Sequence, residues 1–244
     1  MSKKKKKTDD ERVLMILNEI NKDDSILDLG CVDHSHLNEK SSDWIHKFLY
    51  EKSNNVLGLD FEKEDIDLLK TKGYNVIYGN VENFQLDNKF DIIIAGHLLP
   101  SLSNPGLFLD NVHKHLKNNG KFILTTANAW VFYRCLNAFF GINKLSAQHT
   151  MLNDLETLTQ LLKRHGFEIT KSDFILYPKK RKTDYHWPDK SDFEQYRNYT
   201  SKNKSNPPKT LLAFIFRKLS VFFYSIGMKT VSGEGIFLVC KKIS

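Results

Sequence analysis

A short apolar stretch near the amino end, Ser25 to His34 (SILDLGCVDH), limits the fold more than any other part of the sequence. Ile26, Leu27 and Leu29 form a run that is typical of a buried parallel strand, and Gly30 ends it where the backbone must turn sharply. In an open α/β sheet, ligands bind beyond the carboxyl ends of the strands, where a glycine lets the main chain approach closely. The stretch therefore predicts a ligand site at the end of this strand.

A second apolar strand, Val56 to Asp60 (VLGLD), follows along the chain and ends in an acid. A carboxylate at the tip of the second strand can accept hydrogen bonds from both hydroxyls of a ribose, while the first turn takes the other end of a nucleoside. The two strand ends together indicate a nucleoside cofactor.

Four segments in chain order, ILDLGC, GLD, FDIIIAGHLL and LKNNGKFILTT, resemble the motifs of the class I S-adenosylmethionine-dependent methyltransferase family, from about Ser25 to about Gly166. The resemblance implies S-adenosyl-L-methionine as cofactor and an α/β fold with a doubly wound, mostly parallel seven-stranded sheet (the Rossmann-like methyltransferase fold). In that fold the last strand, here Gly235 to Cys240, runs antiparallel between the fifth and sixth. The resemblance also implies that the cofactor contacts Asp28, Gly30, Cys31, Asp60, Phe61, Asn80, Val81 and His97.

The first loop departs from the family pattern, which commonly has glycine at every second position. Val32 and His34 stand where the second and third glycines would be, and we expect them to crowd the loop. Two interpretations remain open: altered cofactor affinity, or a fold kept without the activity. Cys31 is expected to be a small side chain beside a tight loop rather than a nucleophile. Asn80 can offer a donor and an acceptor to an adenine edge, or it can satisfy its own backbone in a turn.

Strands and helices alternate along the chain, as in a doubly wound sheet. The spacing of Thr8 and Glu11 is that of a capping box at the start of a first helix. Asn104 and Pro105 predict the start of a later helix, which Gly120 is expected to end.

The pattern predicts a core at 10–177 that is completed by a final strand at 231–244, a basic disordered tail at 1–9 and an insertion at 178–230. The first half of the insertion mixes basic and aromatic residues, which suits a small lid or, less favoured, single-stranded nucleic acid. In its second half, 209–228, apolar residues form a helical stripe, while Arg217 and Lys218 exclude a membrane span. This helix could cover the acceptor site, lie on an anionic membrane or form a homodimer contact.

The formal net charge of +7 invites a nucleic-acid interpretation, but one basic cluster, Lys3 to Lys7, is typical of a solvated terminal tail. Cys31, Cys135 and Cys240 lie far apart without metal-ligand spacing, which predicts a reducing compartment with no disulfide framework and no metal site. No apolar run follows the basic start, so we expect no signal peptide. The expected location is cytoplasmic, with a peripheral membrane contact as an alternative.

Methyl transfer from a sulfonium depends mostly on alignment, because the leaving group is already activated; positioning is worth ~7–11 kcal/mol and a general base ~10²–10⁴-fold. Two histidines at the same sheet edge are candidate bases for an acceptor hydroxyl: His97 after the fourth strand and His149 in the loop after the fifth. For each, the alternative is a loop histidine without a catalytic role. We rank His149 first and expect His97 to line the cofactor pocket through its backbone.

The leading hypothesis is an S-adenosylmethionine-dependent methyltransferase that acts on a hydroxyl of a small, glycan-like or amphipathic acceptor. After the fourth strand the chain has GHLLPS rather than an Asn- or Asp-Pro-Pro-aromatic run, which disfavours transfer to the exocyclic nitrogens of bases. The alternatives are a non-catalytic cofactor-binding or partner subunit and an RNA methyltransferase. A nicotinamide-dependent dehydrogenase is the weakest alternative, because the first loop has one glycine rather than a spaced set.

Overall fold

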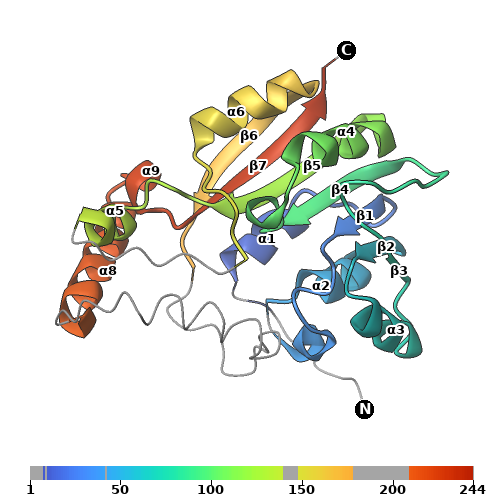
Figure 1. Cartoon of the computed structure of the whole chain (residues 1–244), viewed down its shortest axis with the longest axis horizontal. Helices are drawn as coiled ribbons and strands as arrows, with labels where there is room; N and C mark the ends of the chain where they lie inside the picture. Colours follow the sequence, from blue (N-terminus) through green and yellow to red (C-terminus); the bar gives the residue numbers. More distant parts are fainter. Residues whose placement is uncertain (1–7, 9, 42, 140–147, 178–208, 244) are drawn as a thin grey trace.

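The computed structural model describes residues 8, 10–41, 43–139, 148–177 and 209–243, which fold around one seven-stranded sheet (Figure 1). The strand order is β3-β2-β1-β4-β5-β7-β6. The strands are β1 (Ser25–Leu29), β2 (Asn55–Asp60), β3 (Val76–Tyr78), β4 (Phe90–Gly96), β5 (Leu116–Ala127), β6 (Phe167–Ile175) and β7 (Gly235–Lys242). Strand β7 runs antiparallel to both of its neighbours, β5 and β6. The predicted fold class and the place of the last strand are confirmed.

Helices cover both faces of the sheet, because side chains alternate between the faces along each strand. From β1, Ile26 packs with α1 and α2 on one face, while Leu27 and Leu29 pack with α4 and α6 on the other. The helices are α1 (Glu11–Leu17), α2 (Ile45–Lys52), α3 (Lys63–Thr71), α4 (Pro105–His115), α5 (Phe132–Phe139), α6 (Leu155–Arg164), α8 (Lys209–Ser225) and α9 (Lys229–Ser232), with 3₁₀ turns η1 (His36–Lys40) and η2 (Leu99–Ser101).

Two of the helix boundaries predicted from the sequence are wrong. The cap of α1 is Asp10, whose carboxylate accepts from the Val13 N–H at 3.1 Å, while the Thr8 hydroxyl accepts from the Asp10 N–H. Gly120 does not end α4; it lies inside β5, where a register shift lets the segment after Leu116 bulge from β4. Helix α5 was not predicted from the sequence.

The first two strand ends lie side by side, as the sequence predicts. Leu29 pairs with Leu59 in the parallel register of β1 and β2, and the Gly30 N–H donates to the Leu59 carbonyl at 2.8 Å. The carboxyl ends of β4 and β5 open at the same edge, since both strands are parallel to β1. This edge is therefore where a ligand of the sheet would bind.

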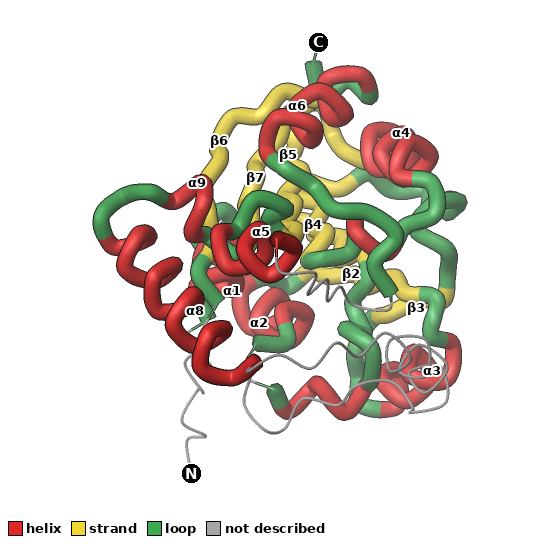
Figure 2. Tube along the Cα trace, turned by 60° about the vertical axis from the view of Figure 1, so that its left-hand side comes forward, coloured by secondary structure: helices red, strands yellow, loops and turns green. Residues whose placement is uncertain are grey.

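A helical appendage, defined here as α5, α8 and α9, lies at this same edge. Helix α5 follows the carboxyl end of β5, and α9 leads into the first residue of β7, which pairs with the last residue of β5. Figures 1 and 2 both show the three helices gathered at one end of the sheet. The predicted lid at 178–208 and the basic tail at 1–7 lie outside the described residues.

Candidate functional site

The loop after β1 has an unusual backbone conformation that prepares one side of the site. Gly30 has a φ of +78°, and a Cβ there would lie 3.1 Å from Leu98. Asp33 (φ 53°) and His34 (φ 74°) also adopt the left-handed conformation, although neither is glycine. The glycine-like turn of the family motif is therefore kept at His34 without the glycine.

Neighbouring side chains hold this loop in place. Trp44 donates its indole N–H to the Cys31 carbonyl at 2.8 Å, and the Val32 N–H donates to the Asp60 carboxylate at 2.9 Å. The Val32 side chain is fully buried in a cluster with Trp44 and Ile66, on the side of α3. The expectation that Val32 crowds the ligand side of the loop is therefore wrong, because its side chain turns into the core.

A hollow beside this loop contains about 260 Å³ of space, part of it open to solvent. The enclosed part of this space is small, so the hollow can hold only one end of a larger molecule. It is lined by Arg12, Asp28, Gly30, Cys31, Asp33, Trp44, Ile45, His46 and Gly96. A Cβ on Gly96 would lie 2.8 Å from Ile45, so a glycine at this position lets Ile45 pack directly against the backbone of β4.

Arg12 of α1 supplies a buried cation to the hollow. Its Nη2 donates to the Asp43 carbonyl at 3.0 Å, whereas its Nε has no hydrogen-bond partner among the described residues. Burial opposes the charge, but Tyr177 and the carboxylates of Asp33 and Asp10 outweigh it and raise the pKa of Arg12. The Nε lies 4.0 Å from the Asp10 carboxylate, an ion pair that is too long for a hydrogen bond. A permanent cation that lines the hollow is well suited to bind a carboxylate.

Asp28 supplies a buried acid to the same hollow. One carboxylate oxygen lies 2.8 Å from His46 Nδ1, and both residues are buried. Because a carboxylate oxygen accepts, Nδ1 carries the hydrogen and donates it. The contact fixes the orientation of Asp28 beside the hollow and leaves its remaining lone pairs for a cationic group.

Asp60 and Phe61 lie at the tip of β2, as predicted. Asp60 is 5% exposed, and its oxygens accept from the N–H groups of Val32 (2.9 Å) and Glu62 (3.2 Å). Burial raises the pKa of Asp60 to about 6, against the effect of these hydrogen bonds. Phe61 is 63% exposed, so its ring is available to stack on a flat ligand.

Asn80 and Val81 follow β3 at the same edge. The Asn80 side-chain oxygen accepts from the Glu82 N–H at 2.9 Å, which is the self-satisfied turn that the sequence left open as the alternative. Val81 is buried in the core cluster with Leu59. Asn80 is exposed, and its amide nitrogen is the group that remains for an adenine edge.

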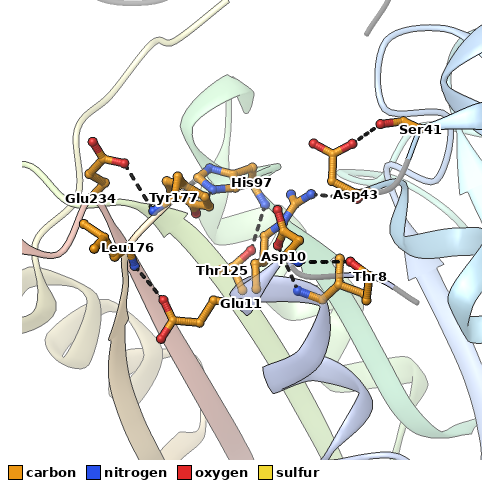
Figure 3. Close-up of polar contacts among 12 residues, drawn as sticks. Thr8, Asp10, Glu11, Ser41, Asp43, His97, Thr125, Leu176, Tyr177 and Glu234 are labelled. Atoms are coloured by element: carbon orange, nitrogen blue, oxygen red, sulfur yellow. Dashed lines mark hydrogen bonds and ion pairs between the residues drawn. The ribbon is translucent and has the colours of Figure 1, made fainter. Parts of the chain in front are cut away.

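His97 is held at the end of β4 in a left-handed conformation (φ 58°), with its N–H donating to the Thr125 carbonyl at 2.9 Å. Its Nε2 is hydrogen-bonded to the hydroxyl of Tyr177, which comes from the end of β6 (Figure 3). Tyr177 lies across Gly235, where a Cβ would be 2.5 Å from the phenol oxygen. His97 thus pairs with a residue that the sequence analysis did not identify.

His149 is half-buried and lies close enough to His34 and Arg134 for their charges to act on it. Burial lowers the pKa of His149, and these two positive groups lower it further. The next residue, Thr150, is anchored to the turn after β4, since its N–H donates to the Pro100 carbonyl at 2.7 Å. His149 is therefore held at the ligand edge as a neutral imidazole at pH 7.

Cys31 carries its thiol into the core rather than into the hollow. It is 2% exposed, and burial, with Asp28 and Asp60 nearby, raises the pKa of the thiol well above its ordinary value. A protonated thiol is a poor nucleophile, so Cys31 has a packing role, as expected. Its carbonyl is the loop group that Trp44 holds.

The residues present fit the two ends of S-adenosylmethionine. The buried Arg12 and Asp28 face one hollow and match the carboxylate and ammonium of an amino acid. Asp60 and the exposed Phe61 lie at the neighbouring strand tip, where a ribose and an adenine would be held.

Arg12 could have been suspected from the sequence, because it falls on the same helical face as Ile16 and interrupts an apolar stripe with a charge.

A family model described as a methyltransferase domain matches residues 4–172. No curated protein sequence matches the chain.

Several solved structures have the same fold. A SAM-dependent methyltransferase from Archaeoglobus fulgidus is 14% identical, with a TM-score of 0.59 over 95% of this chain and 91% of that one. One from Mesorhizobium loti is 13% identical, with a TM-score of 0.55 over 95% and 98%. A Haloferax volcanii structure, a complex with the Trm112 methyltransferase activator, is 11% identical, with a TM-score of 0.58 over 96% and 89%. At these identities the likeness shows the fold.

Proposed function

Because the chain belongs to the methyltransferase-domain family and S-adenosylmethionine is its methyl donor, we propose that it methylates a hydroxyl of a small, glycan-like or amphipathic acceptor. The single observation that carries this proposal is the place of His149, which the bond from the Thr150 N–H to the Pro100 carbonyl holds at the edge where the cofactor site opens and whose pKa burial lowers. When bound, the cofactor supplies a methyl group on a positively charged sulfur.

His149 is the proposed base. An alcohol is a weak nucleophile until its proton is removed, and a neutral imidazole nitrogen can accept that proton. Burial and the neighbouring Arg134 and His34 lower the pKa of His149, which favours its neutral form, and the Arg134 cation would also favour a developing alkoxide. An amine acceptor would arrive as a cation and would be repelled by the same groups.

His97 is proposed to position the acceptor together with Tyr177. Two hydrogen bonds from its N–H to Thr125, at 2.9 and 3.2 Å, fix its backbone, and its ring is engaged by the Tyr177 hydroxyl. The two side chains form a hydrogen-bonded polar surface at the ends of β4 and β6 (Figure 3). Such a surface can orient an acceptor hydroxyl and exclude bulk water from the methyl transfer.

The surroundings of this edge support the proposed acceptor class and location. Apolar helices of the appendage border it, which favours an acceptor with an apolar portion and a cytoplasmic protein with a peripheral membrane contact. RNA is a less favoured acceptor. A non-catalytic partner subunit is the other alternative, and the Haloferax volcanii complex shows a similar fold bound to a methyltransferase activator.

Calorimetry with S-adenosylhomocysteine and a methyl-transfer assay on a panel of acceptors test the proposal together. We expect binding of the cofactor product, turnover with hydroxyl-bearing amphipathic acceptors and none with their amine analogues. Preferred methylation of the amines would contradict the hydroxyl assignment. Binding with no turnover on either set, together with a mass that rises with concentration, would favour the partner-subunit alternative.

A further inference from the structure

Helix α8 presents a row of large apolar side chains to solvent. Ile215, Leu219 and Phe222 are 42%, 37% and 55% exposed, and Ile226, just past the helix end, is 56% exposed. Their spacing of four, three and four residues places them on one face of a helix. This outer stripe, Ile215, Leu219, Phe222 and Ile226, forms a continuous apolar surface.

The outer stripe is not the side by which α8 attaches to the protein. Ser220 is 1% exposed, the Phe223 ring lies 5.4 Å from the Phe132 ring of α5, and the Tyr224 hydroxyl donates to the Phe174 carbonyl at 2.8 Å. These residues anchor the inner face of α8. The helix is therefore apolar on two sides, and among the described residues nothing packs over the outer side to explain it.

Charge distinguishes the segments that form this end of the molecule. Although the chain has 29 acidic residues, the described segments at this end, 128–139, 148–153 and 209–232, contain none. The same segments carry the cations Arg134, Lys209, Arg217, Lys218 and Lys229, of which Lys229 is paired with Asp173 at 2.9 Å. Lys218 is exposed on α8, within one residue of Leu219 in the outer stripe. Asp173 and Glu11 reach these helices from β6 and α1, but the helices themselves carry only cations, which complement a negatively charged surface.

Two further side chains at this end suit a lipid interface. Trp130, just before α5, is 59% exposed, and Phe139 at the end of α5 is 83% exposed. Tryptophan is enriched at the headgroup level of bilayers. Among the residues described, no helix is long and apolar enough to cross a membrane.

We propose that the outer stripe seats the protein on an anionic lipid bilayer, with α8 in the plane of the interface. Apolar side chains bury in the headgroup boundary, and flanking cations attract anionic lipid, which are the two terms that govern interfacial helices. A second copy of the chain fits less well, because the cations of these helices would face those of the other copy. Resting on the proposed function, this seating would bring an amphipathic acceptor to the edge where the cofactor site opens.

Flotation of the full chain with vesicles tests the proposal. We expect association with vesicles of phosphatidylcholine and phosphatidylglycerol in equal parts, and much weaker association with phosphatidylcholine alone. The double variant Phe222→Ser, Ile226→Ser should weaken the association at least tenfold, and Lys218→Gln should weaken it about fivefold. Leu107→Ser, at a residue 51% exposed on α4, is the matched control and should leave it unchanged.

Three outcomes would overturn the proposal. One is no association with anionic vesicles, and another is equal association with both vesicle types. The third is a mass that rises with concentration in the native chain but not in the double variant, without vesicle binding, which would make a second copy the occupant. Calorimetry of the double variant with S-adenosylhomocysteine should match the native chain, so a failed vesicle assay is separable from a failed cofactor site.

Discussion

The main-chain N–H of Val32, in the first loop, donates a 2.9 Å hydrogen bond to the carboxylate of Asp60, at the tip of the neighbouring strand. The bond ties together the two strand ends between which the cofactor would lie. Asp60 is buried and has a pKa raised to about 6, so its charge is sensitive to pH and to what binds beside it. The loop and the acid therefore act as one unit.

Cofactor affinity should depend on the charge of Asp60. Ribose hydroxyls donate to the ionised carboxylate, so binding favours loss of its proton, and a pKa of about 6 sets where that happens. We expect the affinity for S-adenosylhomocysteine, measured by calorimetry, to rise up to tenfold per pH unit below pH 6 and to level above it. The Asp60→Asn variant should bind weakly with a flat profile; an unchanged profile would remove Asp60 from the site.

The stability of the ligand-free protein should follow the opposite trend. Because the folded pKa of Asp60, about 6, lies above its ordinary 3.8, its contribution to stability is complete below pH 4 and is lost as the pH rises through 6. The loss amounts to about 3 kcal/mol, at 1.36 kcal/mol per pKa unit. Urea unfolding at pH 4.5 and at pH 7.5 captures about 2 kcal/mol of this loss, and the native chain should lose more between these values than Asp60→Asn does.

Arg12 should recognise one end of the cofactor only. A hydrogen bond to a charged group is worth ~1.5–3 kcal/mol, so Arg12→Met should weaken binding of S-adenosylhomocysteine about ten- to a hundredfold. Adenosine lacks the amino-acid end, and its affinity should not change. Equal losses for both ligands would mean that the substitution disturbs the whole site rather than a carboxylate contact.

Two variants should separate the roles of the candidate bases. His149→Gln should lower kcat by ~10²–10⁴-fold with little change in cofactor affinity, as expected for loss of a base. In the native enzyme, kcat should be flat above pH 7, because burial and positive neighbours lower the pKa of His149 below 6.5. Tyr177→Phe should instead raise the KM for the acceptor with a smaller effect on kcat. Reversed effects would assign the base to the pair of His97 and Tyr177.

Gly58 of β2 should be intolerant of a side chain. A Cβ there would lie 2.6 Å from both Cys31 and His46 and 2.8 Å from Val76, so the core must shift on three sides. We expect Gly58→Ala to lower the free energy of unfolding by ~1–3 kcal/mol. Gly79→Ala, where the nearest atom is 3.3 Å away, is the control and should cost clearly less in the same thermal unfolding measurement.

The sheet and its ligand edge could be predicted because apolar runs mark strands and parallel strands share an edge. Gly30 and Asp60 were placed in this way. The partners of these residues could not be predicted, since the contacts from Asp28 to His46 and from His97 to Tyr177 depend on side-chain packing. Helix α5 was missed because Trp130 and Val131, directly before it, are not capping residues.

Adjacent residues of α1 serve two distant parts of the molecule. Glu11 accepts from the Leu176 N–H at 2.9 Å and contacts the Tyr224 hydroxyl of α8 at 3.3 Å, while Arg12 faces the hollow beside β1. A tilt of this two-turn helix would therefore shift both the contact of Glu11 with α8 and the position of Arg12 at the hollow. A displacement of the appendage would thus be passed on, through the seven residues of α1, to the residues that bind the methyl donor.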